Sequence, residues 1–213
     1  MLSRSEEKLN KIRSDIDALG ADIRRSGDML LTALKDADAA EFERSRAVLS
    51  GIDAAANAID NEIVTSLALF GAEAHDLREL VAYLKITNEM VRIADNVRGF
   101  AKKMSKYISS CRQEGMLQLC KSSISALHLA LNNDHLQSED MYRKVKVEES
   151  KSDDLYAILE KNILKELGKN LDFSANCIEI LSTARKLEKI ADRSVAIAKL
   201  ILYARSGGAL RTH

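Results

Sequence analysis

Apolar side chains recur at three- and four-residue spacing through most of the chain, which is the period of an amphipathic α-helix. The first such stretch covers residues 3–36, and its apolar positions include Leu9, Ile12, Ile16, Leu19 and Ile23. The same period predicts five more helices, over about 38–70, 73–110, 113–131, a stretch that ends at Leu167, and 172–205. The pattern therefore predicts an all-α fold with six long helices.

Polar and glycine residues mark the expected helix ends. Asp36-Ala-Asp38 interrupts the first helix, and Asp38-Ala-Ala-Glu41 has the form of a capping box for the second. We expect this second helix to run from that cap to about Phe70. Gly71 and Gly168 stand where C-caps would end the second and fifth helices.

Composition supports the all-α prediction. The chain has 213 residues, no proline and only 4% aromatic residues, so it lacks both the main helix breaker and the usual material of a β-sandwich. It carries 32 basic and 32 acidic residues. This balance argues against a nucleic-acid partner, because no net field would hold the phosphates.

Three further observations predict a cytoplasmic protein without a membrane span. No apolar run approaches the ~20 residues that cross a bilayer. The first ten residues, MLSRSEEKLN, lack the apolar core of a secretory signal. Three widely spaced cysteines suit reduced thiols that fill the core better than a disulfide framework; they are Cys111, Cys120 and Cys177.

The sequence contains an internal repeat. Val91-Arg-Ile-Ala-Asp95 returns near the C-terminus as Glu188-Lys-Ile-Ala-Asp192. The six expected helices divide accordingly into two copies of a three-helix unit, residues 1–110 and 111–213. Short turns between long helices make neighbours antiparallel, so we expect two tandem three-helix bundles.

Two pairs of carboxylates stand four residues apart in the second copy: Glu149 with Asp153, and Glu188 with Asp192. This spacing puts both members of a pair on one helix face, about 5–6 Å apart. If the two helices are neighbours, four carboxylates converge. An oxygen-rich site of this kind suits iron, manganese, magnesium or calcium, and matches zinc less well.

The alternative is an ordinary solvated acidic face. Acidic pairs at this spacing are common on exposed helices, and Lys151, Lys186 and Lys189 lie close enough in sequence to neutralise them. Spacing alone favours this second interpretation.

The first copy keeps only the aspartate of each pair, Asp60 and Asp95. Ala56 and Val91 stand where the second copy has its glutamates. Asp53, two turns before Asp60 on the same face, is expected to compensate in part.

Other candidate chemistry is sparse. His75 and His128 have no carboxylate or cysteine at ligand spacing, so we expect satisfied or solvated imidazoles. No glycine-rich phosphate loop, nucleophile elbow or His-Glu-x-x-His pattern occurs. Four methionines are expected in the core: Met90, Met104, Met116 and Met141.

Two sets of motifs resemble those of the PhoU family of phosphate-signalling regulators. The first copy carries Asp76-Leu-Arg78, Leu84-Lys-Ile86, Glu89 and Arg92-Ile-Ala-Asp95. The second carries Glu149-x-x-x-Asp153-Asp-Leu-Tyr156 and Leu187-Glu-Lys-Ile-Ala-Asp192. The order and spacing agree over nearly the whole chain.

The resemblance implies a fold and a cofactor. It implies two three-helix bundles side by side, with acidic motifs that bind a multinuclear metal cluster, expected to be iron, with manganese, magnesium or zinc as alternatives. Carried over by position, the ligands are Glu149, Asp153, Glu188 and Asp192 in the second copy, and Asp60 and Asp95 in the first.

The resemblance also implies a function without catalysis. The expected partners are the ATPase of a phosphate-importing ABC transporter and a membrane sensor kinase. The protein is then a cytoplasmic homodimer, held at the inner membrane through its partners. Two alternatives stay open: a regulatory subunit or domain of another transporter, of the sodium–phosphate symporter type, and a carboxylate–metal hydrolase.

Overall fold

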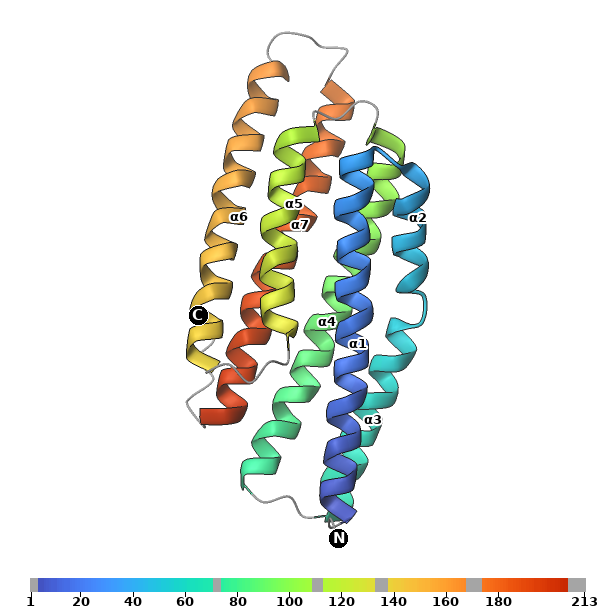
Figure 1. The fold of residues 1–213 in the computed structure, drawn as a ribbon, viewed down its shortest axis with the longest axis vertical. Coiled ribbons are helices and arrows are strands. Elements are labelled where there is room, and N and C mark those ends of the chain that lie inside the picture. Colours follow the sequence, from blue (N-terminus) through green and yellow to red (C-terminus); the bar gives the residue numbers. More distant parts are fainter. Residues whose placement is uncertain (1–3, 71–73, 109–112, 133–137, 168–173, 207–213) are drawn as a thin grey trace.

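The computed structural model describes residues 4–70, 74–108, 113–132, 138–167 and 174–206. These residues form helices joined by short turns, and they contain no strand. Figure 1 shows the helices in chain order: α1 (Arg4–Asp36), α2 (Ala39–Val48), α3 (Ile52–Phe70), α4 (Ala74–Tyr107), α5 (Gln113–Leu131), α6 (Ser138–Leu167) and α7 (Ser174–Ser206). The predicted all-α fold class is confirmed.

The helices form two sets, α1 to α4 and α5 to α7. In the first set α1 packs against α2, α3 and α4, and in the second set α5, α6 and α7 pack against one another. The two sets join where α4 lies along α7 and α1 lies along α5. Figure 1 shows α6 on one side, α1 to α3 on the other, and α4, α5 and α7 between them.

One hydrophobic core runs through both sets. It includes Ile12 and Phe42 from the first and Leu119 and Ile190 from the second, all fully or almost fully buried. The four methionines predicted for the core, Met90, Met104, Met116 and Met141, are buried. Cys120 and Cys177 are buried as expected, and Cys111 lies outside the described residues.

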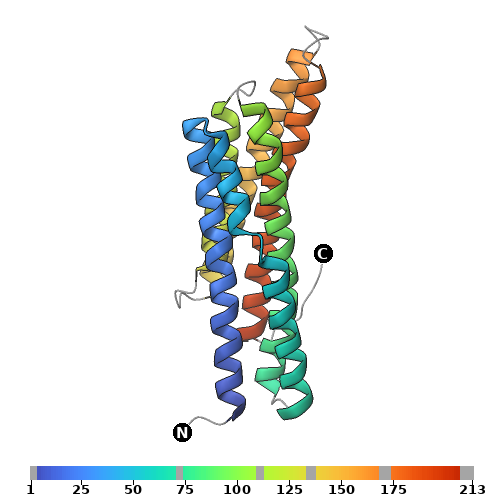
Figure 2. The ribbon, with the colours of Figure 1, turned by 90° about the vertical axis from the view of Figure 1, so that its right-hand side faces the viewer.

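The second predicted helix is not continuous. It is present as α2 and α3, separated by a turn at residues 49–51 that Figure 2 shows as a step between the two helices. The Leu49 side chain is fully buried, and its N–H donates at 3.1 Å to the carbonyl of Arg46, which tightens the chain there. Periodicity could not reveal this break because Leu49 keeps an apolar residue in the expected place.

The cap predicted at Asp38 is half correct. Asp38 accepts a hydrogen bond from the N–H of Ala40 at 2.8 Å and so caps α2. Glu41, the other half of the expected capping box, instead pairs with Arg44 one turn along the helix. The expected C-caps, Gly71 and Gly168, lie outside the described residues.

None of the helices in the described ranges is long and apolar enough to cross a membrane.

Candidate metal site

Three carboxylates converge between α6 and α7. Asp153 comes from α6, and Glu188 and Asp192 come from successive turns of α7; one oxygen from each lies within 4.8 Å of the others. The four-residue spacing keeps Glu188 and Asp192 on one face of α7, and the packing of α6 along α7 brings Asp153 to that face. The structure therefore unites three of the four acidic residues predicted in the second repeat.

Glu149, the fourth, does not belong to this group. Its Oε2 accepts from Nζ of Lys146 at 2.9 Å, one turn earlier on α6. Its negative charge nevertheless contributes to raising the pKa of Asp153. Glu149 is therefore a neighbour of the group, held by its own counter-ion.

Burial and mutual repulsion both act on the converging carboxylates. Burial, followed by the charges of Glu149 and Asp192, raises the pKa of Asp153. Burial and the charge of Asp192 raise the pKa of Glu188, which is only 6% exposed. Oε2 of Glu188 is buried without a hydrogen-bond partner and lies 3.1 Å from Nε of Arg185 as an ion pair. The surroundings of Asp153 and Glu188 therefore disfavour their charged forms.

One lysine lies against the group itself. Nζ of Lys189 is 2.6 Å from Oδ2 of Asp192 and 3.5 Å from Oε1 of Glu188. The other two lysines expected to neutralise the pairs point elsewhere: Lys151 pairs with Glu148, and Lys186 lies against Gly99 of α4.

Two basic residues beside the second-repeat site, Lys146 and Arg185, were not predicted from the sequence. Each stands three residues before a glutamate of the predicted site, Glu149 or Glu188. That spacing places a base and an acid on one helix face. This spacing could therefore have predicted the Lys146–Glu149 and Arg185–Glu188 ion pairs from the sequence.

The donor set fits a hard cation. Three carboxylates converge, and the most buried of them, Glu188, has an oxygen without a hydrogen-bond partner. Oxygen donors of this kind suit magnesium, manganese or iron. The residues that would hold the ion are the exposed Asp153, the buried Glu188 and the partly buried Asp192, and a bound cation would supply positive charge to this group.

In the first repeat an arginine lies between Asp95 and Asp53, whereas Asp60, the counterpart of Asp153, has a different partner. Arg98 of α4 donates from Nη2 to Asp95 at 2.6 Å and from Nη1 to Asp53 of α3 at 2.9 Å. Its hydrogen bonds lower the pKa of Asp53. Asp60 accepts from the hydroxyl of Thr87 at 2.6 Å. The described residues of this repeat thus bring no three ligands together around Asp60 and Asp95.

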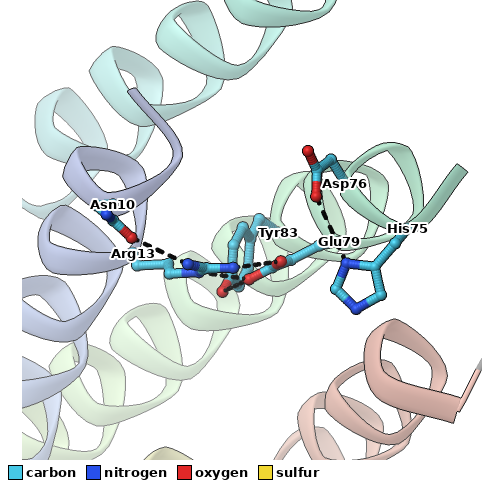
Figure 3. A network of polar contacts seen from close by, with 6 residues as sticks. All are labelled: Asn10, Arg13, His75, Asp76, Glu79 and Tyr83. Carbon is cyan, nitrogen blue, oxygen red and sulfur yellow. Dashed lines mark hydrogen bonds and ion pairs between the residues drawn. The ribbon is translucent and has the colours of Figure 1, made fainter. Parts of the chain in front are cut away.

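A second group of potential ligands lies at the start of α4. His75, Asp76 and Glu79 offer three atoms within 4.8 Å of one another, and Figure 3 shows them beside Arg13 and Tyr83. Glu79 is already occupied: Arg13 donates to both its oxygens at 2.7 Å, and Tyr83 donates to Oε1 at 2.5 Å. We interpret this network as an ion pair that fastens α1 to α4.

Both histidines in the described residues have acidic neighbours, so the expectation that His75 lacks a carboxylate at ligand spacing was wrong: Asp76 and Glu79 follow it by one and four residues. Nδ1 of His75 lies 3.5 Å from Asp76, and Nε2 of His128 lies 2.7 Å from Asp28 of α1. The prediction of satisfied or solvated imidazoles agrees with this geometry.

A cavity of about 440 Å³ adjoins the Arg13–Glu79 pair, where α1 and α4 meet the ends of α5, α6 and α7. Its walls are mainly apolar, with Ile86, Met90 and Ile197 among them. Gly20 lines it as well, and a Cβ at Gly20 would lie 3.5 Å from Cε of Met90. The charged residues that line it carry both signs, among them Arg13, Asp17 and Glu79.

One protein family matches both repeats of the chain. The family model described as the PhoU domain matches the chain twice, at residues 16–104 and 114–201. The phosphate-specific transport system accessory protein PhoU homolog of Xylella fastidiosa (strain 9a5c) is 25% identical over 208 residues, which cover 95% of this chain and 86% of that protein. Its counterpart in Rhizobium meliloti is 21% identical over 211 residues, covering 97% and 89%.

Two solved structures share the fold. The crystal structure of PhoU from Pseudomonas aeruginosa superposes with a TM-score of 0.86 at 21% identity, covering 95% of this chain and 99% of that one. The phosphate transport system regulatory protein PhoU from Streptococcus pneumoniae gives a TM-score of 0.82 at 22% identity, covering 98% and 100%.

Proposed function

The chain belongs to the PhoU family, and from that premise we propose that it regulates phosphate uptake and phosphate-responsive signalling by contact with other proteins. The observation that carries the proposal is the double family match, one match in each repeat, over 16–104 and 114–201. Relatives that align with nearly the whole chain are named as accessory proteins of the phosphate-specific transport system.

The proposed partners are the ATPase of a phosphate ABC transporter and a membrane sensor kinase, reached from the cytoplasm as a homodimer. Exposed apolar side chains on α6 and α7 support a role in protein contact: Val147, Ile158 and Leu164 of α6 and Ile178 of α7 are each more than half exposed. An adaptor of this kind acts by binding one state of its partner better than another.

We further propose that the protein does not catalyse a reaction. Burial raises the pKa of the Cys120 thiol, so it is a poor nucleophile at neutral pH. The buried hydroxyls of Ser123 and Ser152 bond to each other at 3.0 Å. These three potential nucleophiles, Cys120, Ser123 and Ser152, are thus committed to structure.

The proposed cofactor is a metal cluster in the second repeat, with iron as the first choice and manganese, magnesium or zinc as alternatives. Support comes from the convergence of Asp153, Glu188 and Asp192 and from the surroundings of Glu188, which disfavour its charged form. Glu149 would join if it left Lys146. Asp60 and Asp95 remain proposed ligands of a weaker first site, which Arg98 opposes.

The regulatory proposal is tested by deleting the gene and measuring transcription of phosphate-starvation genes in phosphate-rich medium. We expect derepression in the deletion strain and normal repression when the wild-type gene is restored. Normal repression without the gene would contradict the proposal.

A further inference from the structure

We propose that the Lys189 ammonium is the resident counter-ion of the acidic group between α6 and α7, and that the first divalent cation to bind there enters in exchange for it. This inference rests on the proposed metal site of the second repeat. It concerns how that site is filled.

The position of Lys189 makes the exchange necessary. Its Nζ lies 2.6 Å from Asp192 and 3.5 Å from Glu188, two of the three residues that would hold the ion. A divalent cation bound to the same two carboxylates would stand within a few ångströms of the ammonium. Like charges so close repel each other strongly at the effective dielectric constants near a protein surface. The two cations therefore exclude each other.

The other two bases can stay in place. Lys146 pairs with Glu149, which lies outside the converging group. Arg185 contacts Oε2 of Glu188, and its guanidinium stacks over the ring of Tyr156 at 5.1 Å from the centroid. Lys189 is thus the base that contacts two of the three converging carboxylates.

The charge balance also favours replacement by a divalent ion. Glu149, Asp153, Glu188 and Asp192 carry four negative charges, and Lys146, Arg185 and Lys189 carry three positive charges, which leaves a net charge of −1. Exchange of Lys189 for a divalent cation makes the sum zero. The cation would replace Lys189 at Oε1 of Glu188 and Oδ2 of Asp192, while Arg185 stays at Oε2 of Glu188.

The Lys189 ammonium can leave its carboxylates, whereas the Arg98 guanidinium that holds Asp53 and Asp95 in the first repeat is fixed. The Lys189 side chain is 38% exposed, and a lysine ammonium is a hydrated point charge on a flexible stem that can swing into water. Arg98 is 24% exposed and uses a planar fork to hold Asp53, Asp95 and the carbonyl of Leu49 together. Exchange is therefore confined to the second repeat.

The test is a calorimetric titration of the full chain, stripped of metal, with Mn²⁺. Lys189→Met removes the competing charge and keeps the length of the side chain, and we expect it to bind Mn²⁺ at least about fivefold more tightly than wild type. Lys189→Arg keeps the charge and should bind no more tightly than wild type. Lys151→Met, which removes an exposed lysine paired with Glu148 on α6, is the matched control and should leave the affinity unchanged.

Several outcomes would overturn the exchange. Equal or weaker Mn²⁺ binding by Lys189→Met in a variant with wild-type circular dichroism would do so, as would equal tightening by Lys189→Met and Lys189→Arg. Absence of Mn²⁺ binding in every variant would overturn both the exchange and the proposed metal site. The regulatory function is judged separately, by the expression of phosphate-starvation genes.

Discussion

Nη2 of Arg98 lies 2.6 Å from Oδ1 of Asp95, one turn earlier on α4. The same guanidinium reaches Asp53 at the start of α3 and the carbonyl of Leu49 in the turn before it. In the first repeat the guanidinium of Arg98 thus neutralises both Asp53 and Asp95. The second repeat leaves its carboxylates to a lysine that can move away.

Removal of Arg98 should weaken the α3–α4 contact. Arg98→Met leaves Asp53, Asp95 and the Leu49 carbonyl without this partner, and we expect the free energy of unfolding to fall by about 1–2 kcal/mol. The pKa of Asp53 should rise toward its ordinary value, because the Arg98 hydrogen bonds are the main cause of its lowering. Urea denaturation and NMR titration measure the two effects.

Arg92→Met is the matched control for Arg98. Arg92 is an exposed arginine on the same helix whose nearest acidic contact, Glu89, is 4.0 Å away. Its loss should change stability by less than about 0.5 kcal/mol. Equal effects of the two substitutions would contradict the clamp role of Arg98.

The two repeats should be coupled through Glu89 and Arg193. Nη1 of Arg193 on α7 donates to Oε2 of Glu89 on α4 at 2.7 Å, and both side chains are at least three-quarters buried. A double-mutant cycle with Glu89→Gln and Arg193→Met should give a coupling energy of about 1 kcal/mol. Additive effects of the two changes would show that this contact does not help to join the repeats.

The Arg13–Glu79 pair should make stability depend on pH in the acid range. Burial alone would raise the pKa of Glu79, but hydrogen bonds from Arg13 and Tyr83 outweigh it and hold the pKa below its ordinary 4.5. The unfolded chain then binds the proton more tightly than the folded protein. The stabilisation is therefore fully present above about pH 4.5 and is lost as the pH falls through the lower, folded pKa.

Glu79→Gln measures that contribution. The amide keeps the shape but not the charge, so the variant should be less stable at pH 7 by about 1–3 kcal/mol, and its stability should fall less steeply below pH 4.5. Thermal unfolding of both proteins between pH 7 and pH 3 provides the comparison. Parallel pH profiles would assign the acid sensitivity to other carboxylates.

A glycine at position 27 should be required for α1 to pack closely against α5. A Cβ at this position would lie 2.9 Å from Cδ1 of Ile124 and 3.4 Å from Cδ2 of Leu127. Gly27→Leu overfills this contact, so we expect a loss of about 1–3 kcal/mol in the free energy of unfolding. Gly51→Ala, where a Cβ would meet nothing within 4 Å, should be neutral in the same denaturant titration.

The sequence by itself determined the repeat, most of the buried positions and the helices, except for the break between α2 and α3. Helical periodicity is local, so residues such as Ile12, Ile16 and Ile23 report the buried face of α1 without knowledge of any other segment. The pairing of Glu188 with Asp192 on one face of α7 follows from the same geometry. The motifs that indicated the family are likewise continuous stretches of chain.

The tertiary structure decided which charges meet. Arg98 and Asp53 are 45 residues apart, and Arg13 and Glu79 are 66 apart, so no helical period connects them. The packing of α6 on α7 selected Asp153 for the acidic group and left Glu149 with Lys146. Ion pairs within one helix, such as Lys146 with Glu149, follow from sequence spacing, whereas pairs between helices, such as Arg98 with Asp53, depend on how the helices pack, and hydrophobic spacing carries no information about them.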